Sequence, residues 1–255
     1  YTDMPYSIDY DGDYLNGGRR GYSWLTMKQI MKAQPLFSIS RIPIEEGSVE
    51  DTALVNYIDK MKLYFADGKS ELDIEKLSYI TCSVTQKLAK NIIVAAKYNG
   101  IEINKHVRPT MDINKPEKSE QLIEESKDSD MMVFVLHGGP REGQCGYSGQ
   151  DKNGRKYPAA FSPKILDQLP NTKMLAGLCC FGARYVHYDK DDSMLLSSME
   201  DNHVVSFMGS SNSVRGGFDP DGKVYHGEEF LKIFVSMIAD GCYTSEALVK
   251  SRYCL

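Results

Sequence analysis

The amino-acid sequence predicts an α/β domain with a mostly parallel β-sheet and helices on both faces of the sheet. From Leu77 onward, short apolar segments alternate with amphipathic segments of helical spacing, which is typical of parallel strands joined by crossover helices. Met131–Leu136 (MMVFVL) is apolar at every position, as expected of a strand buried on both faces. The chain has 255 residues, of which 42% are hydrophobic, so it can enclose a core of this kind.

The expected elements follow one another in a repeating order. The first strand, Leu77–Val84, precedes a helix over Thr85–Tyr98, whose apolar residues recur at three-to-four spacing and whose end is marked by Gly100. Ser162 is expected to cap a helix over Pro163–Leu169, with the proline in its first turn. The further expected elements are a strand near Ile101–Val107, a helix over Glu117–Ser126, strands over Met131–Leu136, Lys173–Cys179 and His203–Met208, and a helix over Glu228–Ala239.

The first part of the chain, residues 1–72, differs in character from the rest. It begins with a segment rich in tyrosine and aspartate and contains a predicted strand at Leu36–Ile42 and a predicted helix at about Val49–Phe65. One strand and one helix cannot enclose a core by themselves. We therefore expect residues 1–72 to be the C-terminal part of an N-terminal α/β subdomain, and residues 73–255 to form the main subdomain.

Composition excludes several classes of function. The 30 basic and 35 acidic residues give a formal charge of -5, and no basic block or basic-aromatic stripe points to nucleic acid as a partner. No apolar segment approaches the roughly 20 residues that a membrane span requires. None of the six cysteines forms a C-x-x-C pair, which argues against a zinc site and leaves room for one reactive free thiol.

Two expected strands end in residues that can do chemistry. His137-Gly138-Gly139 follows MMVFVL, and Cys179-Cys180-Phe181-Gly182 follows KMLAGL. The carboxyl ends of parallel strands are where catalytic groups gather, so if the two strands are neighbours both side chains meet at one edge. A thiol becomes a strong nucleophile when a histidine removes its proton, so Cys180 and His137 form a minimal dyad. The backbone N–H groups of Gly138 and Cys180 could then stabilise an oxyanion.

Structural roles compete with these catalytic roles. A buried cysteine at a strand end is commonly a small hydrophobic residue, and a single histidine there is commonly a satisfied core residue. Cys179 is expected to face the opposite side of its strand from Cys180, because successive side chains alternate. A nucleotide site is not supported, since no G-x-G-x-x-G or P-loop follows any strand.

The order of strand, His-Gly, spacer, strand and Cys, with a glycine two residues after the Cys, resembles the clan of caspases, legumains, clostripains and gingipains. The caspase signature Q-A-C-[RQG]-G, with a histidine about 50 residues upstream, has a similar spacing. The segments TDMPYSIDYDGD, FSISRIPI and VNYIDKMKLYFADG resemble the corresponding run of the gingipain-like family, with Ser40 in place of a glycine. The closing segments HVVSFMGSSN and EEFLKIFVSMIADGCYTSEALVKSR are also similar to the end of those domains.

This resemblance implies a caspase-like fold and a cysteine endopeptidase that acts on a peptide or protein substrate through a thioester on Cys180, with His137 as general acid/base. It implies no cofactor for the chemistry and a secreted or cell-surface location. An alternative is a catalytically inactive caspase-like module that binds a peptide or a partner protein.

The sequence departs from the family where its substrate pocket is expected. Arginine-cleaving gingipains carry an aspartate early in the helix after the first strand, whereas this chain has Gln86 and neighbouring lysines, Lys87 and Lys90. The glutamate that orients the histidine in those enzymes is replaced by Val84 and Thr85. The residues expected to line the substrate site are Gln86, Ser210, Asn212 and Arg215.

The charges around that expected site allow opposite preferences. Arg215, Lys87 and Lys90 would favour neutral or acidic substrate side chains at P1, unless they are solvated surface charges. Acids beyond Cys180 could fold back and restore a basic preference; they are Asp189, Asp191 and Asp192.

Asp9, Asp11 and Asp13 place three carboxylates at alternate positions around Gly12. Carboxylate oxygens at this spacing could hold a structural calcium ion, and calcium sites known in the gingipain family agree with that expectation. The segment is not an EF-hand, because Arg20 stands where the loop would need its closing glutamate. A tight solvated turn is the competing interpretation.

Overall fold

The computed structural model describes residues 52–66, 72–83, 85–86, 89–107, 117–138, 147–150, 153–154, 156–185, 188–189, 191–200, 203–210 and 226–253. All of them lie within one compact unit, Ile42–Leu255. The predicted strand at Leu36–Ile42 and the acidic cluster of Asp9, Asp11 and Asp13 fall outside the described residues. The predicted subdomain boundary near residue 72 stays a prediction.

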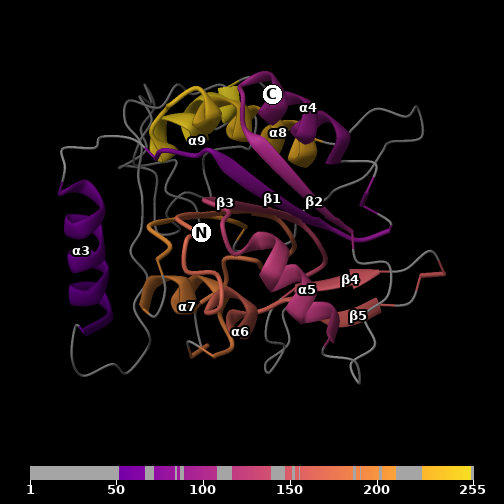
Figure 1. The fold of residues 1–255 in the computed structure, drawn as a ribbon, viewed down its shortest axis with the longest axis horizontal. Helices are drawn as coiled ribbons and strands as arrows, with labels where there is room; N and C mark the ends of the chain where they lie inside the picture. Colours follow the sequence, from indigo (N-terminus) through magenta and orange to yellow (C-terminus); the bar gives the residue numbers. More distant parts are fainter. Residues whose placement is uncertain are drawn as a thin grey trace, which may run out of the picture. The chain divides into compact units, whose positions relative to one another are not determined.

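A five-stranded parallel sheet forms the centre of this unit (Figure 1). The spatial order is β2-β1-β3-β6-β7, and every neighbouring pair is parallel. The strands are β1 (Lys76–Thr81), β2 (Glu102–Val107), β3 (Met131–Val135), β6 (Met174–Leu178) and β7 (Ser206–Met208). The predicted parallel α/β class is therefore confirmed, and each of the five expected strands is present with slightly different ends.

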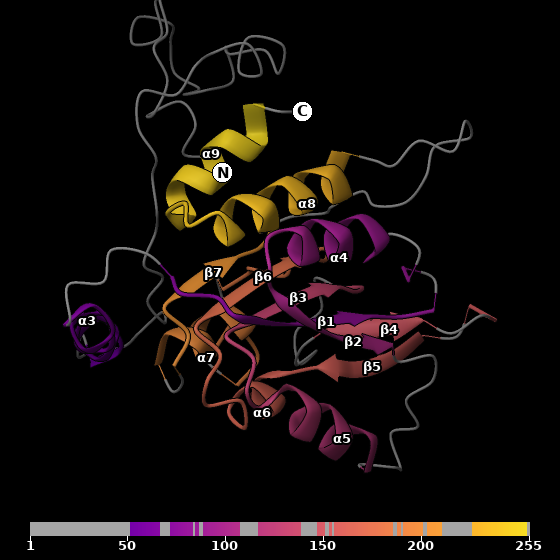
Figure 2. The same cartoon turned by 45° about the horizontal axis from the view of Figure 1, so that its top comes forward.

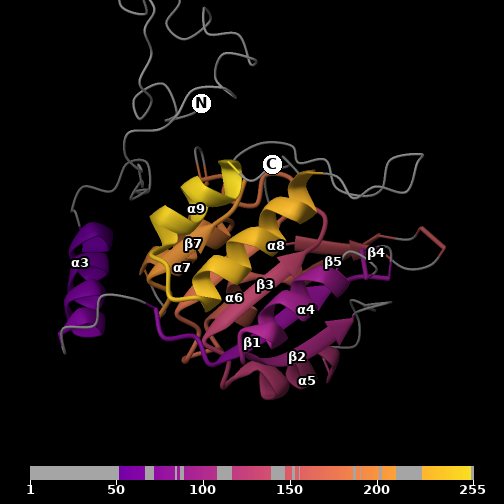
Figure 3. The same cartoon turned by 90° about the horizontal axis from the view of Figure 1, so that it is seen from above.

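Alternate residues of each central strand enter two separate cores. Leu77, Val133 and Ala176 belong to one core, whereas Ile80, Phe134 and Leu175 belong to the other. The first core is closed by α4 (Ala89–Tyr98), α8 (His226–Ala239) and α9 (Thr244–Tyr253); the second is closed by α5 (Glu117–Ser126), α6 (Pro163–Leu166) and α7 (Met194–Glu200). Figure 2 shows α4, α8 and α9 on one face of the sheet and α5 and α6 on the other, and Figure 3 shows α4 and α8 lying over the strands and running along them. Burial on both faces explains why β3 is apolar throughout.

The helix expected over Thr85–Tyr98 begins later than predicted, at Ala89. Thr85 lies in a turn, because its N–H donates to the Cys82 carbonyl (3.1 Å) and its hydroxyl donates to the Val135 carbonyl (2.8 Å). These bonds tie the turn after β1 to the end of β3. At its other end α4 stops at Tyr98, and Gly100 lies just beyond it with a φ of 79°, which glycine adopts readily; the sequence predicts this ending.

Other predicted boundaries change by a few residues. The helix expected over Pro163–Leu169 ends at Leu166, where Asp167 is the C-cap and Leu169 closes a turn by donating to the Leu166 carbonyl. Ser162 has the extended conformation of an N-cap, although its side chain makes no capping hydrogen bond.

Several elements are not anticipated by the sequence patterns. An antiparallel hairpin of β4 (Tyr147–Gln150) and β5 (Lys156–Phe161) lies between β3 and β6 in the chain. Helices α7 and α9 are also additional. The hairpin segments, YSGQ and KYPAAF, contain glycine and proline, which weaken strand patterns.

Helix α3 (Thr52–Phe65) packs against α7. Lys60 Nζ donates to three carbonyl oxygens, those of Ser198 (2.9 Å), Met199 (3.0 Å) and Val204 (3.0 Å), and the Tyr57 hydroxyl donates to the Val205 carbonyl (2.9 Å). Two of the three carbonyls belong to the last turn of α7, where a cation is favoured. No described helix has the length and apolar character of a membrane span.

Candidate functional site

His137 and Cys180 follow two strands that are direct neighbours in the sheet. β3 pairs with β6 in parallel, with Val135 opposite Leu178, so both chains leave the sheet at the same edge. The Leu136 N–H still donates to the Leu178 carbonyl (3.1 Å), which extends the pairing one residue beyond β3. The sheet therefore brings the two segments together, as the strand-end reasoning requires.

The backbone of His137 is fixed by the hairpin. His137 and Ser148 exchange two backbone hydrogen bonds, each 2.7 Å long, in an antiparallel bridge. The His137 Nε2 atom is buried and has no hydrogen-bond partner. A buried polar atom without a partner costs about 1–3 kcal/mol, so a histidine with only a structural role is expected to be satisfied.

Gly138 lies directly against the backbone of Cys180. A Cβ atom at Gly138 would be 1.8 Å from the Cys180 carbonyl oxygen and 3.2 Å from Cys179 Sγ. Only glycine permits this approach. The contact shows that the residue after His137 touches the backbone of Cys180. The predicted oxyanion role of the Gly138 and Cys180 N–H groups stays a prediction.

The chain makes a tight turn immediately after Cys180. Phe181 has a φ of 57°, a left-handed conformation that costs a non-glycine residue roughly 1–2 kcal/mol. The turn is held from both sides: the Tyr147 hydroxyl donates to the Gly182 carbonyl (2.7 Å), and the Ala183 N–H donates to the Ser210 carbonyl (2.9 Å). Strain of this kind is stored where the surrounding structure fixes it, and such places are often functional sites.

The two adjacent cysteines have different environments. Cys179 is 2% exposed and belongs to the second core, and burial raises the pKa of its thiol well above the usual value. Cys180 is only half-buried. Cys179 is therefore a core residue, and Cys180 is the thiol of this pair that solvent can reach.

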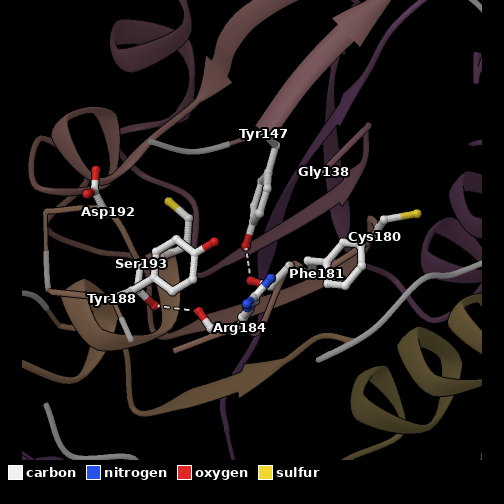
Figure 4. Close-up of a pocket in the computed structure, with 10 residues that line it drawn as sticks. Gly138, Tyr147, Cys180, Phe181, Arg184, Tyr188, Asp192 and Ser193 are labelled. Atoms are coloured by element: carbon white, nitrogen blue, oxygen red, sulfur yellow. Dashed lines mark hydrogen bonds between the residues drawn. The ribbon is translucent and has the colours of Figure 1, made fainter. Parts of the chain in front are cut away.

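A small cavity of about 30 Å³ lies beside the turn, large enough for one or two water molecules. The Arg184 guanidinium lies over the rings of Phe181 (5.8 Å) and Tyr188 (5.2 Å), as in cation–π contacts. Figure 4 shows the Cys180 side chain pointing away from the side chains of Tyr147, Arg184 and Tyr188. The thiol thus faces away from this cavity. The lining residues are Gly138, Tyr147, Cys180, Phe181, Gly182, Arg184, Tyr188, Asp192, Ser193 and Met194.

A third cysteine, Cys82, lies at the same sheet edge. It follows β1, which pairs with the other side of β3. Burial by itself would raise the pKa of Cys82, but hydrogen bonds with the side chains of His137 and Thr85, and with the backbone of Thr85 and Gln150, lower it to about 6. Cys82 is therefore a buried cysteine with a lowered pKa that the sequence reasoning did not select.

The residues expected to bind substrate are only partly described. Gln86 is exposed in the turn after β1, and Ser210 accepts the hydrogen bond from Ala183. Asn212 and Arg215 lie outside the described residues. Asp192 lines the small cavity, whereas Asp189 and Asp191 are exposed. Within the described part of the chain, no group of three or more His, Cys, Asp or Glu side chains is arranged to hold a metal ion.

Three residues of this site were missed by the sequence analysis: Cys82, Tyr147 and Phe181. The strand-end argument does not select Cys82, because the sequence predicts a strand that runs to Val84, whereas β1 ends at Thr81. Tyr147 gives no comparable signal, since its role depends on a hairpin with a weak sequence pattern. The positive φ of Phe181 cannot be read from its residue type. No protein-family model matches the chain, and the search of curated proteins finds no match either.

Proposed function

We propose that the chain is a cysteine endopeptidase, with Cys180 as the nucleophile and His137 as the general acid/base. The observation that carries the proposal is the buried, unpartnered Nε2 of His137 on a strand whose end touches the backbone of Cys180 through Gly138. A histidine nitrogen in this position is available for a proton that a substrate or nucleophile supplies. The strained turn after Cys180 supports the same assignment.

In the proposed reaction His137 Nε2 takes the proton of the Cys180 thiol, and the sulfur attacks the carbonyl carbon of a peptide bond. Backbone N–H groups of Gly138 and Cys180 stabilise the oxyanion. His137 then returns the proton to the leaving amine, which departs and leaves a thioester on Cys180. Water, activated by His137, hydrolyses the thioester and releases the free thiol.

The finer features of the proposal come from the resemblance to the gingipain-like family. They are a caspase-like form of the parallel sheet, a peptide or protein substrate, no cofactor for the chemistry, a calcium ion at Asp9, Asp11 and Asp13, and a secreted or cell-surface location. The hairpin inserted between the two strands that carry His137 and Cys180 is compatible with this form.

A second candidate function is an inactive module that binds a peptide or a partner protein. One observation favours it: the Cys180 side chain points away from the adjoining cavity. Under this interpretation the strand-end edge would bind a peptide without cleaving it.

Cleavage of a fluorogenic peptide library separates the two candidates. We expect turnover by the wild-type chain and its loss in both Cys180→Ala and His137→Ala, with circular dichroism unchanged. Cys179→Ala is the matched control, because it removes an adjacent thiol that is buried in the core, and it should retain activity. Turnover that persists in Cys180→Ala would refute the nucleophile assignment, and peptide binding without any turnover would favour the inactive module.

The same library tests the expected preference at P1. The charges of Lys87, Lys90 and Arg215 predict neutral or acidic P1 side chains. A clear preference for arginine or lysine would overturn that expectation and direct attention to Asp192 at the small cavity.

A further inference from the structure

We propose that helix α3 positions the nucleophile, and that Lys60 and Tyr57 are the positioning residues through which it acts. The two side chains hold the α7–β7 unit, which consists of α7 with Ser193 before it and of the segment 203–210 that contains β7. This unit in turn holds the turn after Cys180. The inference rests on the proposed peptidase function, because it concerns the nucleophile of that function.

Helix α3 is bonded to the end of α7 and to the segment that leads into β7. The acceptors of Lys60 Nζ are the carbonyl oxygens of Ser198 (2.9 Å), Met199 (3.0 Å) and Val204 (3.0 Å). The Tyr57 hydroxyl donates to the carbonyl of Val205 (2.9 Å), the residue just before β7. An ammonium group has three N–H bonds and is favoured at the last turn of a helix, so Lys60 joins both arms of the unit at one point.

This anchor is partly shielded from water. The hydrogen bonds of Lys60 and Tyr57 are partly buried, and burial raises the pKa of the Tyr57 hydroxyl above its usual value. Lys60 Nζ also lies 5.7 Å from the centre of the Tyr57 ring, as in a cation–π contact. Hydrogen bonds from a charged donor contribute more than those between neutral groups, so removal of Lys60 should have a measurable effect on the unit that it holds.

The opposite end of α7 contacts the turn after Cys180. The Ser193 hydroxyl donates to the Arg184 carbonyl (2.9 Å) and accepts a hydrogen bond from the Leu196 N–H (3.3 Å), so one group both caps α7 and holds the turn. Ser193 is 2% exposed, and with Met194 it lines the small cavity beside the turn. A shift of α7 would therefore move Ser193 and the Arg184 carbonyl that it holds.

The far end of the β7 segment contacts the same turn. The Ala183 N–H donates to the Ser210 carbonyl (2.9 Å), and a Cβ atom at Gly209 would lie 3.1 Å from the Ala183 Cβ. β7 has only three residues, and among the described strands its partner is β6. So short a ladder gives the segment few hydrogen bonds of its own, and the bond from Tyr57 at its start adds a fixed point.

Both contacts act on a turn whose backbone conformation is strained. Phe181 has a φ of 57°, which is disfavoured for a residue with a side chain, and the Arg184 N–H closes the turn by donating to the Phe181 carbonyl (3.1 Å). A strained conformation persists only when the surrounding structure fixes it. Tyr147 fixes the turn from the hairpin, and α3 fixes it through the α7–β7 unit. Loss of the α3 contacts should therefore let the turn relax and move Cys180 relative to His137.

The test compares Lys60→Met and Tyr57→Phe with Gly100→Ala in the peptide-cleavage assay. Gly100 has a φ of 79° and follows α4, which closes the other core, so this control loses stability without touching the α7–β7 unit. We expect each α3 variant to lower kcat by about 10-fold with KM unchanged, because a misplacement of about 1 Å can cost about 100-fold and a partial relaxation costs less. Gly100→Ala should keep the wild-type kcat.

Tyr57→Phe keeps nearly the whole side-chain volume, so it tests the path even if Lys60→Met does not fold. A wild-type kcat in either folded α3 variant would overturn the proposal. An equal loss of kcat in Gly100→Ala would overturn it as well, because the effect would then follow stability alone.

A second readout, amide hydrogen exchange, does not depend on peptidase activity. Exchange at the hydrogen-bonded amides of Ala183 and Arg184 should become about 10-fold faster in Lys60→Met and less so in Tyr57→Phe, because a charged donor forms the stronger hydrogen bond. In Gly100→Ala the two amides should not accelerate more than the amide of Val133 in β3. If the turn amides accelerate as expected but the wild-type chain cleaves no peptide, the proposed function fails and the path from α3 to the turn remains. If the wild-type chain cleaves peptides but exchange at the turn is unchanged in both α3 variants, the role of α3 is wrong.

Discussion

Gly138→Ala tests whether the contact between the ends of β3 and β6 controls the proposed chemistry. The added Cβ would lie 1.8 Å from the Cys180 carbonyl oxygen, whereas real Cβ atoms do not come within 3.0 Å of another heavy atom. The obstacle is backbone held in a strained turn, so it cannot rotate away as a side chain would. The two chain ends must therefore separate by at least about 1.2 Å.

A displacement of this size moves Cys180 relative to His137. Misplacement of reacting groups by about 1 Å can reduce a rate by about 100-fold, so we expect kcat to fall by that order. Overpacking should also lower the free energy of unfolding by about 1–3 kcal/mol. The assays are peptide cleavage and urea denaturation.

Gly100→Ala is the matched control for the loss of stability. Gly100 has a φ of 79° and no atom within 4 Å of the added Cβ, so the substitution introduces backbone strain of about 1–2 kcal/mol at the end of α4 without touching the site. Gly100→Ala should be less stable and keep wild-type kcat. If Gly138→Ala folds and keeps wild-type kcat, the inferred dependence of catalysis on this contact is refuted.

Three further substitutions test other parts of the structure. Tyr147→Phe removes the hydrogen bond to the turn after Cys180 and should cost about 1–3 kcal/mol of unfolding free energy in urea denaturation; no loss would show that the turn does not need this bond. Lys60→Met removes three hydrogen bonds to the α7 end and should lower stability by about 2–3 kcal/mol, with protease cleavage increased within α3; unchanged cleavage would contradict the docking role of Lys60. The folded-state pKa of Cys82, about 6, lies below the ordinary value of a cysteine, so its ionised form adds to the free energy of unfolding. This contribution is complete above about pH 9 and is lost as the pH falls through about 6. Urea denaturation at pH values across this range should show the dependence in the wild-type chain and not in Cys82→Ser.

The central sheet could be predicted because its strands carry a strong physical signal. β3 lies between two strands and two layers of helices, so every one of its side chains is buried and all five residues are apolar. The hairpin lacks that signal. β4 contains a serine and a glycine, and among the described strands its partner is β5. Its structure therefore depends on contacts with His137 and the turn after Cys180 rather than on its own periodicity.

The candidate site also contains residues that could be predicted from the sequence and residues that could not. His137 and Cys180 could be selected because a strand end is visible in the sequence and the carboxyl edge of a parallel sheet follows from it. The presence of Cys82 at the same edge could not, because it requires the spatial order β1-β3-β6, in which the end of β3 lies between two strand ends that are followed by cysteines. The late start of α4 has a similar cause: Thr85 bonds to Val135 across the sheet edge, and this tertiary contact overrides a helical pattern.

The hairpin strand β4 links the two proposed catalytic segments. Ser148 bonds to the backbone of His137, and the Tyr147 hydroxyl donates to the Gly182 carbonyl beyond Cys180. The parallel sheet fixes only where the chains emerge from its edge. The residues beyond that edge have left the strand ladder, so their relative positions depend on hydrogen bonds from outside the sheet. A single short strand that contacts both segments keeps them in register with one another, and the geometry of the proposed site therefore depends on the stability of β4 as much as on that of the sheet.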